Sequence, residues 1–226
     1  MSGPWTLKNS LLWGVGRCLL AALLLLGGGC GSDSAQTAGA SDSSPTVGYV
    51  GASLTLGAVD GYRTLGGTNL WPDGDAASSY PGGSVSAWYL NLTDTGNPNN
   101  RWKTFAALLA KYSGTNRIWW HLCPRASTTD SIPTYDQALA VLNRIKEETN
   151  AEIYATAAPV MPAVQDTSEY DALSGYLATM ISQGLVKKGP DLTPLTLDQL
   201  GADGHPNEAG KAVWGKDLQS FFDGAL

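Results

Sequence analysis

Short apolar runs alternate with helical patterns along the chain after residue 45. Apolar, β-branched runs of a few residues predict buried strands, and apolar side chains that recur every three or four positions predict amphipathic helices. The expected strands cover 46–50, 117–123 and 152–157, and the expected helices cover 102–112, 134–149, 168–183 and a last stretch after Pro206. Residues 56–99 are rich in Gly, Asn, Asp, Ser and Pro, which predicts long surface loops.

This order of elements predicts an α/β domain. Strands that are separated by helices are typical of a parallel sheet with helices packed against it. In open sheets of this kind, sites form at the carboxyl ends of the strands. Ser53 follows the first expected strand, the segment after His121 follows the second, and residues 159–162 follow the third. We therefore expect a functional site where these segments meet.

The first part of the chain, residues 1–29, has the pattern of a secretory signal. Lys8 and Arg17 supply positive charge, and the apolar run at 18–26 is shorter than a membrane span. Three glycines then lead to Cys30, an arrangement that resembles the lipobox of bacterial lipoproteins. The resemblance implies that Cys30 becomes the lipid-modified first residue and anchors the protein to a membrane of the bacterial cell envelope, outside the cytoplasm. An ordinary secretory signal that is cleaved after the glycines is the alternative.

Residues 30–45 are expected to form a flexible tether, and residues 46–226 a single domain. The tether is small and polar, so it offers little that can pack into a core. The remaining stretch of about 180 residues is enough for one core and too short for two comfortable domains.

Charge and cysteine content argue against several classes of protein. The first 29 residues hold two of the 14 basic residues and none of the 20 acidic ones, so the rest has a net charge of about −8, which argues against nucleic acid as a partner. Cys18 lies in the signal and Cys30 is assigned to the anchor, so Cys123 has no disulfide partner within the expected monomer. No cluster has metal-ligand spacing and no phosphate-binding glycine loop is present, so we expect neither a metal nor a cofactor.

Ser53 and His205 are the candidate catalytic pair. A serine hydroxyl needs an adjacent base to become a nucleophile, and the chain has only two histidines. The backbone N–H of Ser53, close to the start of a helix, is placed to stabilise an oxyanion. The structural alternatives are that Ser53 caps the first helix, and that Pro206 and Asn207 only begin the last one.

Two segments resemble the SGNH (GDSL-type) hydrolase superfamily. Gly-Ala-Ser-Leu-Thr at 51–55 is similar to its Gly-Asp-Ser-Leu-Thr nucleophile block, and Asp-Gly-His-Pro-Asn-Glu-Ala-Gly at 203–210 is similar to its C-terminal Asp-Gly-x-His-Pro-Asn-x-x-Gly block. The members of this superfamily are esterases, lipases and carbohydrate deacetylases. Their fold is a flavodoxin-like three-layer sandwich with a central parallel sheet, and the resemblance implies the same fold here. The nucleophile elbow of α/β-hydrolases is disfavoured, because Thr55 stands where that motif needs glycine.

The C-terminal block departs from the family in the position of its acid. The family places its aspartate three residues before the histidine, and this position is Ala202 here. We assign Asp203, two residues before His205, as the acid that orients the imidazole. Asp198 and a Ser–His dyad without a carboxylate are the alternatives. Losing an orienting carboxylate costs up to about 10⁴ in rate.

The resemblance also implies further oxyanion donors. Besides the Ser53 N–H, the family uses a glycine, for which Gly83 is the candidate, and an asparagine after the next central strand. No asparagine follows that strand here, and Arg125 or His121 is the alternative donor. His121 lies beside two tryptophans, which favours a packed, hydrogen-bonded residue. Cys123 is expected to be a small buried hydrophobe.

Together these features predict a lipid-anchored serine esterase that acts on small acyl esters, with O-acetyl groups on glycans as one class. Thioesters and lysophospholipids are left open as substrates. Aromatic residues in the expected loops either stack on sugar rings or cover the core, namely Trp71, Tyr80, Trp88 and Tyr89. The alternative function is a catalytically degenerate domain of the same fold that binds surface glycan without turnover.

Overall fold

The computed structural model describes residues 45–72, 82–125, 131–162 and 164–224. The chain divides into two compact units, Met1–Ala40 and Ser41–Leu226, and all the described residues belong to the second. The expected signal, Cys30, nearly all of the tether and Tyr80 lie outside the described residues. Among the helices of the described ranges, none combines the length and the apolar character that crossing a membrane requires.

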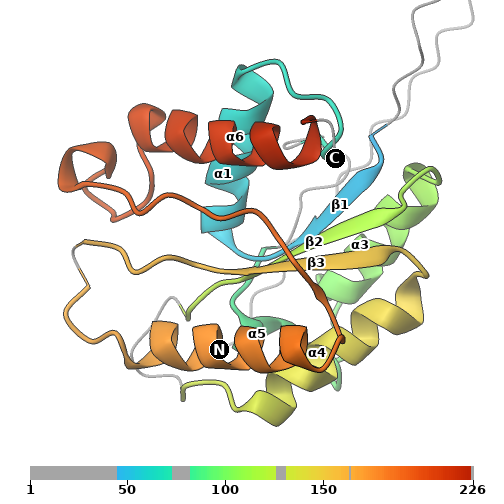
Figure 1. The fold of residues 1–226 in the computed structure, drawn as a ribbon. Coiled ribbons are helices and arrows are strands. Elements are labelled where there is room, and N and C mark those ends of the chain that lie inside the picture. The colour runs from blue at the N-terminus through green and yellow to red at the C-terminus, as the bar shows by residue number, and fades with distance from the viewer. Residues whose placement is uncertain (1–44, 73–81, 126–130, 163, 225–226) are drawn as a thin grey trace, which may run out of the picture. The chain divides into compact units, whose positions relative to one another are not determined.

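The second unit is an α/β domain in which most of the expected elements are present. Its elements in chain order are β1 (Val47–Val50), α1 (Ser53–Thr64), α2 (Val85–Leu90), α3 (Arg101–Lys111), β2 (Arg117–Leu122), α4 (Tyr135–Glu148), β3 (Glu152–Ala157), α5 (Ser168–Ser182), β4 (Lys187–Lys188), the 3-10 helix η1 (Leu197–Gln199) and α6 (Glu208–Phe222) (Figure 1). The three expected strands are confirmed as β1, β2 and β3, and the expected helices as α3, α4, α5 and α6.

The sheet is parallel throughout its four strands, which are ordered β1-β2-β3-β4. Val50 pairs with Trp120, which in turn pairs with Ala155, so the carboxyl ends of the first three strands lie at one edge. A single parallel bridge joins Leu70 to Val47 on the free side of β1. If the segment at Leu70 is counted as the second segment along the chain, the order across the sheet is Leu70, β1, β2, β3 and β4, which is second, first, third, fourth and fifth in chain order. The chain therefore leaves β1 and β2 in opposite directions.

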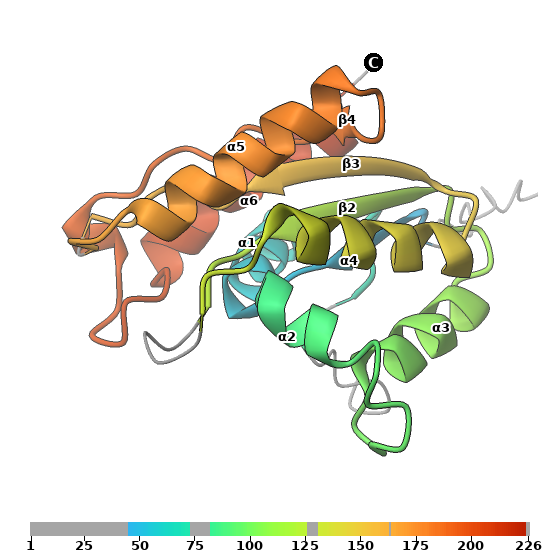
Figure 2. The ribbon, with the colours of Figure 1, turned by 90° about the horizontal axis from the view of Figure 1, so that it is seen from below.

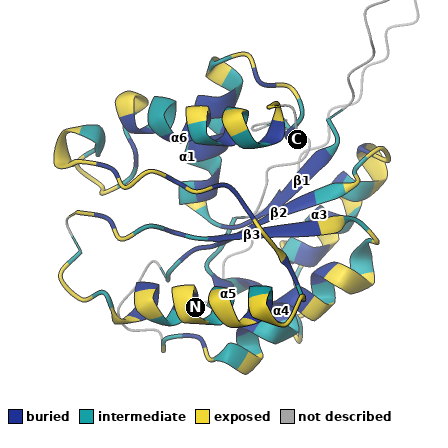
Figure 3. Cartoon of the chain, viewed as in Figure 1, coloured by how far each residue is buried: buried dark blue, intermediate teal, exposed yellow. Residues whose placement is uncertain are grey.

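Helices cover both faces of the sheet. α1 and α6 lie on one face, and α4 and α5 lie on the other, with α2 and α3 beside α4 (Figures 1 and 2). β1 is buried along its whole length, and β2 and β3 are buried in all but their outer residues, as expected for a sheet that is covered on both sides (Figure 3). The expectation of a parallel α/β architecture is confirmed, and the layers are those of a three-layer α/β sandwich.

Tryptophans fill much of the core. Trp71 and Trp88 are each 1% exposed, and Trp71 stacks on Tyr112 with ring centroids 5.9 Å apart. Of the two roles that the sequence left open for these tryptophans, core packing is therefore the one that the structure shows. Tyr89 is only partly buried and packs against the same core.

The expectation that residues 56–99 form loops is wrong for two segments, because α1 extends to Thr64 and α2 covers 85–90. Glycines made α1 resemble a loop, since glycine costs about 1 kcal/mol in a helix interior. In the structure, a methyl group added at Gly61 would overlap with the carbonyl group of Lys211 in α6, and one added at Gly215 would overlap with Gly61. Gly61 of α1 is thus explained by the close packing of this helix against α6.

Candidate active site

Ser53 and His205 meet at the carboxyl edge of the sheet. Ser53 is the first residue of α1 and follows β1, whereas His205 lies just before α6. The Ser53 Oγ is 2.7 Å from the His205 Nε2, although the two residues are 152 positions apart in the chain. Ser53 is exposed to solvent, so a substrate can reach its hydroxyl. The structure therefore brings together the two residues that the sequence selected.

Neither side chain of the pair caps a helix. The N-cap of α1 is Ala52, and the Ser53 side chain bonds His205, so the alternative that Ser53 caps the helix is wrong. Asn207 does cap α6, because its Oδ1 accepts hydrogen bonds from the N–H groups of Ala209 and Gly210 at 3.0 and 3.2 Å. The capping role at this segment is thus confirmed for Asn207, and it leaves the imidazole of His205 available.

Asp203 lies beside the imidazole despite its unusual spacing. Its Oδ1 accepts a hydrogen bond from the His205 backbone N–H at 3.1 Å, and its Oδ2 is 3.3 Å from Nδ1. The backbone hydrogen bond, with the charge of the imidazole, holds the pKa of the Asp203 carboxyl below its usual range. A tight turn makes this approach possible: Gly204 has a φ of 77°, and the Gly201 N–H donates to the His205 carbonyl at 2.7 Å.

The coupling between Asp203 and His205 is nevertheless loose. The Nδ1 atom is shielded from solvent and makes no hydrogen bond of acceptable geometry with any described residue. The Asp203 side chain is 72% exposed, so water weakens its interaction with the ring. The alternative acid, Asp198, accepts a hydrogen bond from the Thr196 hydroxyl at 2.6 Å instead. The structure thus places Asp203, and not Asp198, beside the imidazole.

The start of α1 supplies two backbone donors. The N–H groups of Thr55 and Leu56 both bond the Ala52 carbonyl, at 3.0 and 3.2 Å. The preceding N–H groups, of Ser53 and Leu54, have no acceptor among the described residues. They lie at the positive end of a 12-residue helix, next to the hydroxyl that would attack.

Gly83 does not fill the role that the sequence assigned to it. Its N–H donates to the Gly51 carbonyl at 2.7 Å, so it is not free to bind an oxyanion, and the prediction is wrong for this structure. Gly82 lies against the turn that precedes Ser53: a methyl group added there would lie 3.2 Å from the Ala52 carbonyl carbon. Gly82 and Gly83 are neighbours in the sequence, and only the path of the backbone shows that their surroundings differ.

Arg125, one of the alternative donors, is held by a mostly buried carboxylate. Its Nε is 3.1 Å from the Glu169 Oε2, and its backbone N–H donates to the Glu169 Oε1 at 2.8 Å. This pair ties the end of β2 to the first turn of α5. Sequence reasoning missed Glu169, because an acidic residue in the first turn of a helix is common for reasons of the helix dipole alone.

A buried polar cluster lies behind the nucleophile. The Thr55 Oγ1 accepts the Ala52 N–H at 2.9 Å, and it is 3.1 Å from the His121 Nδ1 and 3.4 Å from the Cys123 Sγ. His121 is 1% exposed and stacks on Trp119 with ring centroids 5.0 Å apart, which confirms the expectation of a packed histidine.

Neither buried titratable group of this cluster suits proton transfer at neutral pH. Burial lowers the pKa of His121 to about 3, and burial raises the pKa of the Cys123 thiol to about 11. The expectation that Cys123 is a small buried residue is confirmed. The contacts of the Thr55 hydroxyl were not predicted, and its position three residues after the helix N-cap was the available signal for the one with Ala52.

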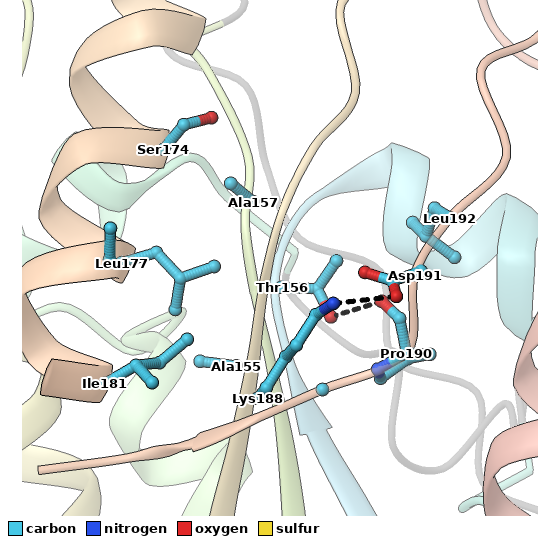
Figure 4. Close-up of a pocket in the computed structure, with 12 residues that line it drawn as sticks. Ala155, Thr156, Ala157, Ser174, Leu177, Ile181, Lys188, Pro190, Asp191 and Leu192 are labelled. Atoms are coloured by element: carbon cyan, nitrogen blue, oxygen red, sulfur yellow. Dashed lines mark hydrogen bonds and ion pairs between the residues drawn. The ribbon is translucent and has the colours of Figure 1, made fainter. Parts of the chain in front are cut away.

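A cavity of about 260 Å³ lies between α5 and the carboxyl half of β3 (Figure 4). Three of its polar side chains are paired: Lys188 Nζ is 2.8 Å from Asp191 Oδ2, and the Thr156 hydroxyl donates to the Pro190 carbonyl at 2.9 Å. Its lining includes neither Ser53 nor any residue of the 203–205 segment. Within the described ranges, no group of three or more His, Cys, Asp or Glu side chains is arranged to hold a metal ion.

Comparison with family models, with curated proteins and with solved structures finds no match to this chain. The candidate active site therefore rests on the geometry of its own residues.

Proposed function

We propose that this protein is a serine esterase of the SGNH type that hydrolyses small acyl esters. The observation that carries the proposal is the 2.7 Å contact between the Ser53 Oγ and the His205 Nε2. A solvent-exposed hydroxyl beside an imidazole, next to unpaired helix N–H groups, is the arrangement that nucleophilic acyl transfer requires.

The chemistry follows from this geometry. The Ser53 Oγ attacks the ester carbonyl carbon while the His205 Nε2 takes the hydroxyl proton. The N–H groups of Ser53 and Leu54 stabilise the oxyanion that forms, and Asp203 stabilises the charged imidazole. The tetrahedral intermediate collapses as Nε2–H protonates the leaving alcohol. Water then attacks the acyl carbon while His205 takes its proton, and the bond to the Ser53 Oγ breaks as His205 returns this proton to the serine, which releases the carboxylic acid.

The sheet order supports the SGNH type of fold. Counted with the bridge at Leu70, the order second, first, third, fourth, fifth is that of flavodoxin-like sheets. In such sheets, ligands bind where the chain leaves two neighbouring strands in opposite directions. Here these strands are β1 and β2, and Ser53 lies directly after β1.

A short acyl group, such as an acetyl group on a glycan, is the substrate class that we favour. This preference follows the resemblance to carbohydrate deacetylases, and the cavity between α5 and β3 is not lined by Ser53 or His205. The lipid anchor expected at Cys30 would hold the enzyme in the cell envelope, where an acylated glycan is accessible.

A domain that binds glycan without turnover is the second candidate. The exposed Asp203, its poor geometry toward Nδ1 and the occupied Gly83 N–H favour it. Loss of one oxyanion donor lowers the rate of reaction by about 10²–10³, and loss of the orienting carboxylate lowers it by up to about 10⁴. Against it stands the Ser53–His205 contact, which neither helix needs for its capping.

Turnover of 4-nitrophenyl acetate by Ser53→Ala separates the two candidates. We expect kcat/KM to fall by at least about 10³, because the substitution removes the nucleophile. His205→Ala should cost a similar factor, and the double variant little more, since the two residues act as one unit. Ser174→Ala, which removes a hydroxyl on α5, is the matched control and should keep native turnover. Equal rates for the native protein and Ser53→Ala would overturn the esterase proposal.

A further inference from the structure

Thr55 is fully buried, and its hydroxyl is surrounded by three polar partners that reach it from different segments. The Ala52 N–H comes from the turn before α1, and the His121 Nδ1 and Cys123 Sγ come from the end of β2. A hydroxyl has one hydrogen to donate and two lone pairs to accept with. It accepts from Ala52, and it donates to one of His121 and Cys123 and accepts from the other, so its hydrogen-bonding capacity is filled.

Both backbone groups of Ala52 are bound by Thr55. The Ala52 N–H donates to the Thr55 side chain at 2.9 Å, and the Ala52 carbonyl accepts from the Thr55 backbone N–H at 3.0 Å. In a trans peptide the N–H points opposite to the carbonyl of the same unit. Since the Ala52 carbonyl points into α1, the Ser53 N–H of that unit points away from the helix, toward the position of the substrate.

The start of α1 also differs from that of most other helices. α2, α3, α4 and α6 each begin with a side chain that caps a backbone N–H, from Ser84, Asn100, Thr134 and Asn207. At α1 the N-cap is Ala52, which has no such side chain. The N–H groups of Ser53 and Leu54 stay free, and the Thr55 hydroxyl orders the turn from the buried side instead.

We propose that Thr55 is a positioning residue for the esterase reaction: its hydroxyl, supported by His121 and Cys123, fixes the peptide whose N–H stabilises the oxyanion. This inference rests on the proposed function. The N–H interacts with full negative charge only in the transition state, so misplacing it lowers kcat and leaves KM nearly unchanged. Deleting an oxyanion donor costs about 10²–10³, and a misaligned donor should cost less, about 10- to 100-fold.

The test compares Thr55→Val, which keeps the shape and removes the hydroxyl, with Thr55→Ser, which keeps the hydroxyl. With 4-nitrophenyl acetate, we expect Thr55→Val to lower kcat about 10- to 100-fold with KM within about twofold, and Thr55→Ser to restore kcat to within about threefold. An arylboronic acid, which forms a tetrahedral adduct on the serine, should lose affinity for Thr55→Val in parallel with kcat/KM.

Thr115→Val is the matched control. The Thr115 hydroxyl accepts from the Trp71 Nε1 at 2.9 Å and donates to the Tyr112 carbonyl at 2.6 Å, and it lies before β2, at the opposite edge of the sheet. This variant should lower the thermal unfolding midpoint with native kcat.

Several outcomes would overturn the inference. A folded Thr55→Val with native kcat would do so, as would a Thr55→Ser variant that is as slow as Thr55→Val. If Thr55→Val does not fold, Cys123→Ala decides: a kcat about two- to fivefold lower supports the inference, and a native kcat rejects it. Failure of the proposed function is distinguishable, because then Ser53→Ala itself turns over at the native rate.

Discussion

Ser53 and His205 are polar residues that folding alone does not explain. α1 has Ala52 as its N-cap and does not use the serine hydroxyl, and α6 is capped by Asn207 without using the imidazole. Each side chain instead meets the other at 2.7 Å. Because neither helix needs these side chains for capping, their hydrogen bond supports the catalytic role that we propose for them.

His121 has the opposite character, because its ring belongs to the core. Its Nδ1 contacts Thr55, whereas its Nε2 has no hydrogen-bond partner among the described residues. Burial lowers its pKa to about 3, against about 6.5 for an unperturbed histidine. The ring therefore stays neutral in the folded protein over the whole range in which an unfolded histidine becomes charged.

This difference predicts a pH dependence of stability. Below pH about 6.5 the unfolded chain binds a proton at His121 that the folded protein does not, so the folded state loses stability as the pH falls toward about 3. The contribution is at most about 1.4 kcal/mol per pH unit. Urea unfolding of the native protein and of His121→Gln between pH 7 and 4 measures it, and the variant should show the shallower decline. Parallel pH profiles for the two proteins would contradict the prediction.

At the scale of elements, two helices determine the separation of the candidate catalytic pair. α1 carries Ser53 at its first residue, and α6 begins three residues after His205. The helices pack so closely that Gly61 of α1 lies against the backbone of Lys211, and Gly215 lies against Gly61. Any change that separates these helices also separates the hydroxyl from the imidazole.

Gly61→Ala should therefore affect stability and activity together. The added methyl group overlaps with the Lys211 carbonyl, and we expect the free energy of unfolding to fall by about 1–3 kcal/mol. Displacing reacting groups by about 1 Å can cost about 10²-fold in rate, so kcat should fall at least about tenfold. Urea unfolding and 4-nitrophenyl acetate turnover measure the two effects.

Gly175→Ala is the control for this substitution. Gly175 lies within α5, and a methyl group added there meets nothing within 4 Å. The change should raise the free energy of unfolding by up to about 1 kcal/mol, as expected for alanine in a helix, with native kcat. If both glycine variants behaved alike, the close packing of α1 on α6 would not be the cause.

At the scale of the whole molecule, the carboxyl edge of the sheet gathers the chemistry. Val47, at the start of β1, lies at the opposite edge from Ser53. β1 therefore begins at the edge away from the candidate site and ends beside it.

The anchor is tested by Cys30→Ser, since Cys30 lies outside the described residues. If the lipid on this cysteine is the only attachment, the variant should appear in the soluble fraction while the native protein remains with membranes. Fractionation of cells that produce each form, followed by immunodetection, is the measurement. An unchanged membrane fraction for Cys30→Ser would show that the lipoprotein assignment is wrong.

The sequence alone determined three of the four strands, four of the helices and the candidate pair. Strands such as β2 are short apolar runs, and helices such as α4 repeat their apolar positions every three or four residues, so local periodicity is enough to find them. Ser53 and His205 were found because serine and histidine chemistry is specific, and because each lies next to the boundary of an expected element.

Only the tertiary structure decided the rest. α1 is a helix despite its glycines, and the Gly83 N–H donates to the Gly51 carbonyl. The turn at Gly204 places the Asp203 carboxylate beside the imidazole. The tertiary structure also places Thr55 against Cys123, 68 positions away. Hydrophobic periodicity is a local property of the chain, whereas the partner of a given N–H or hydroxyl depends on which distant segments pack beside it.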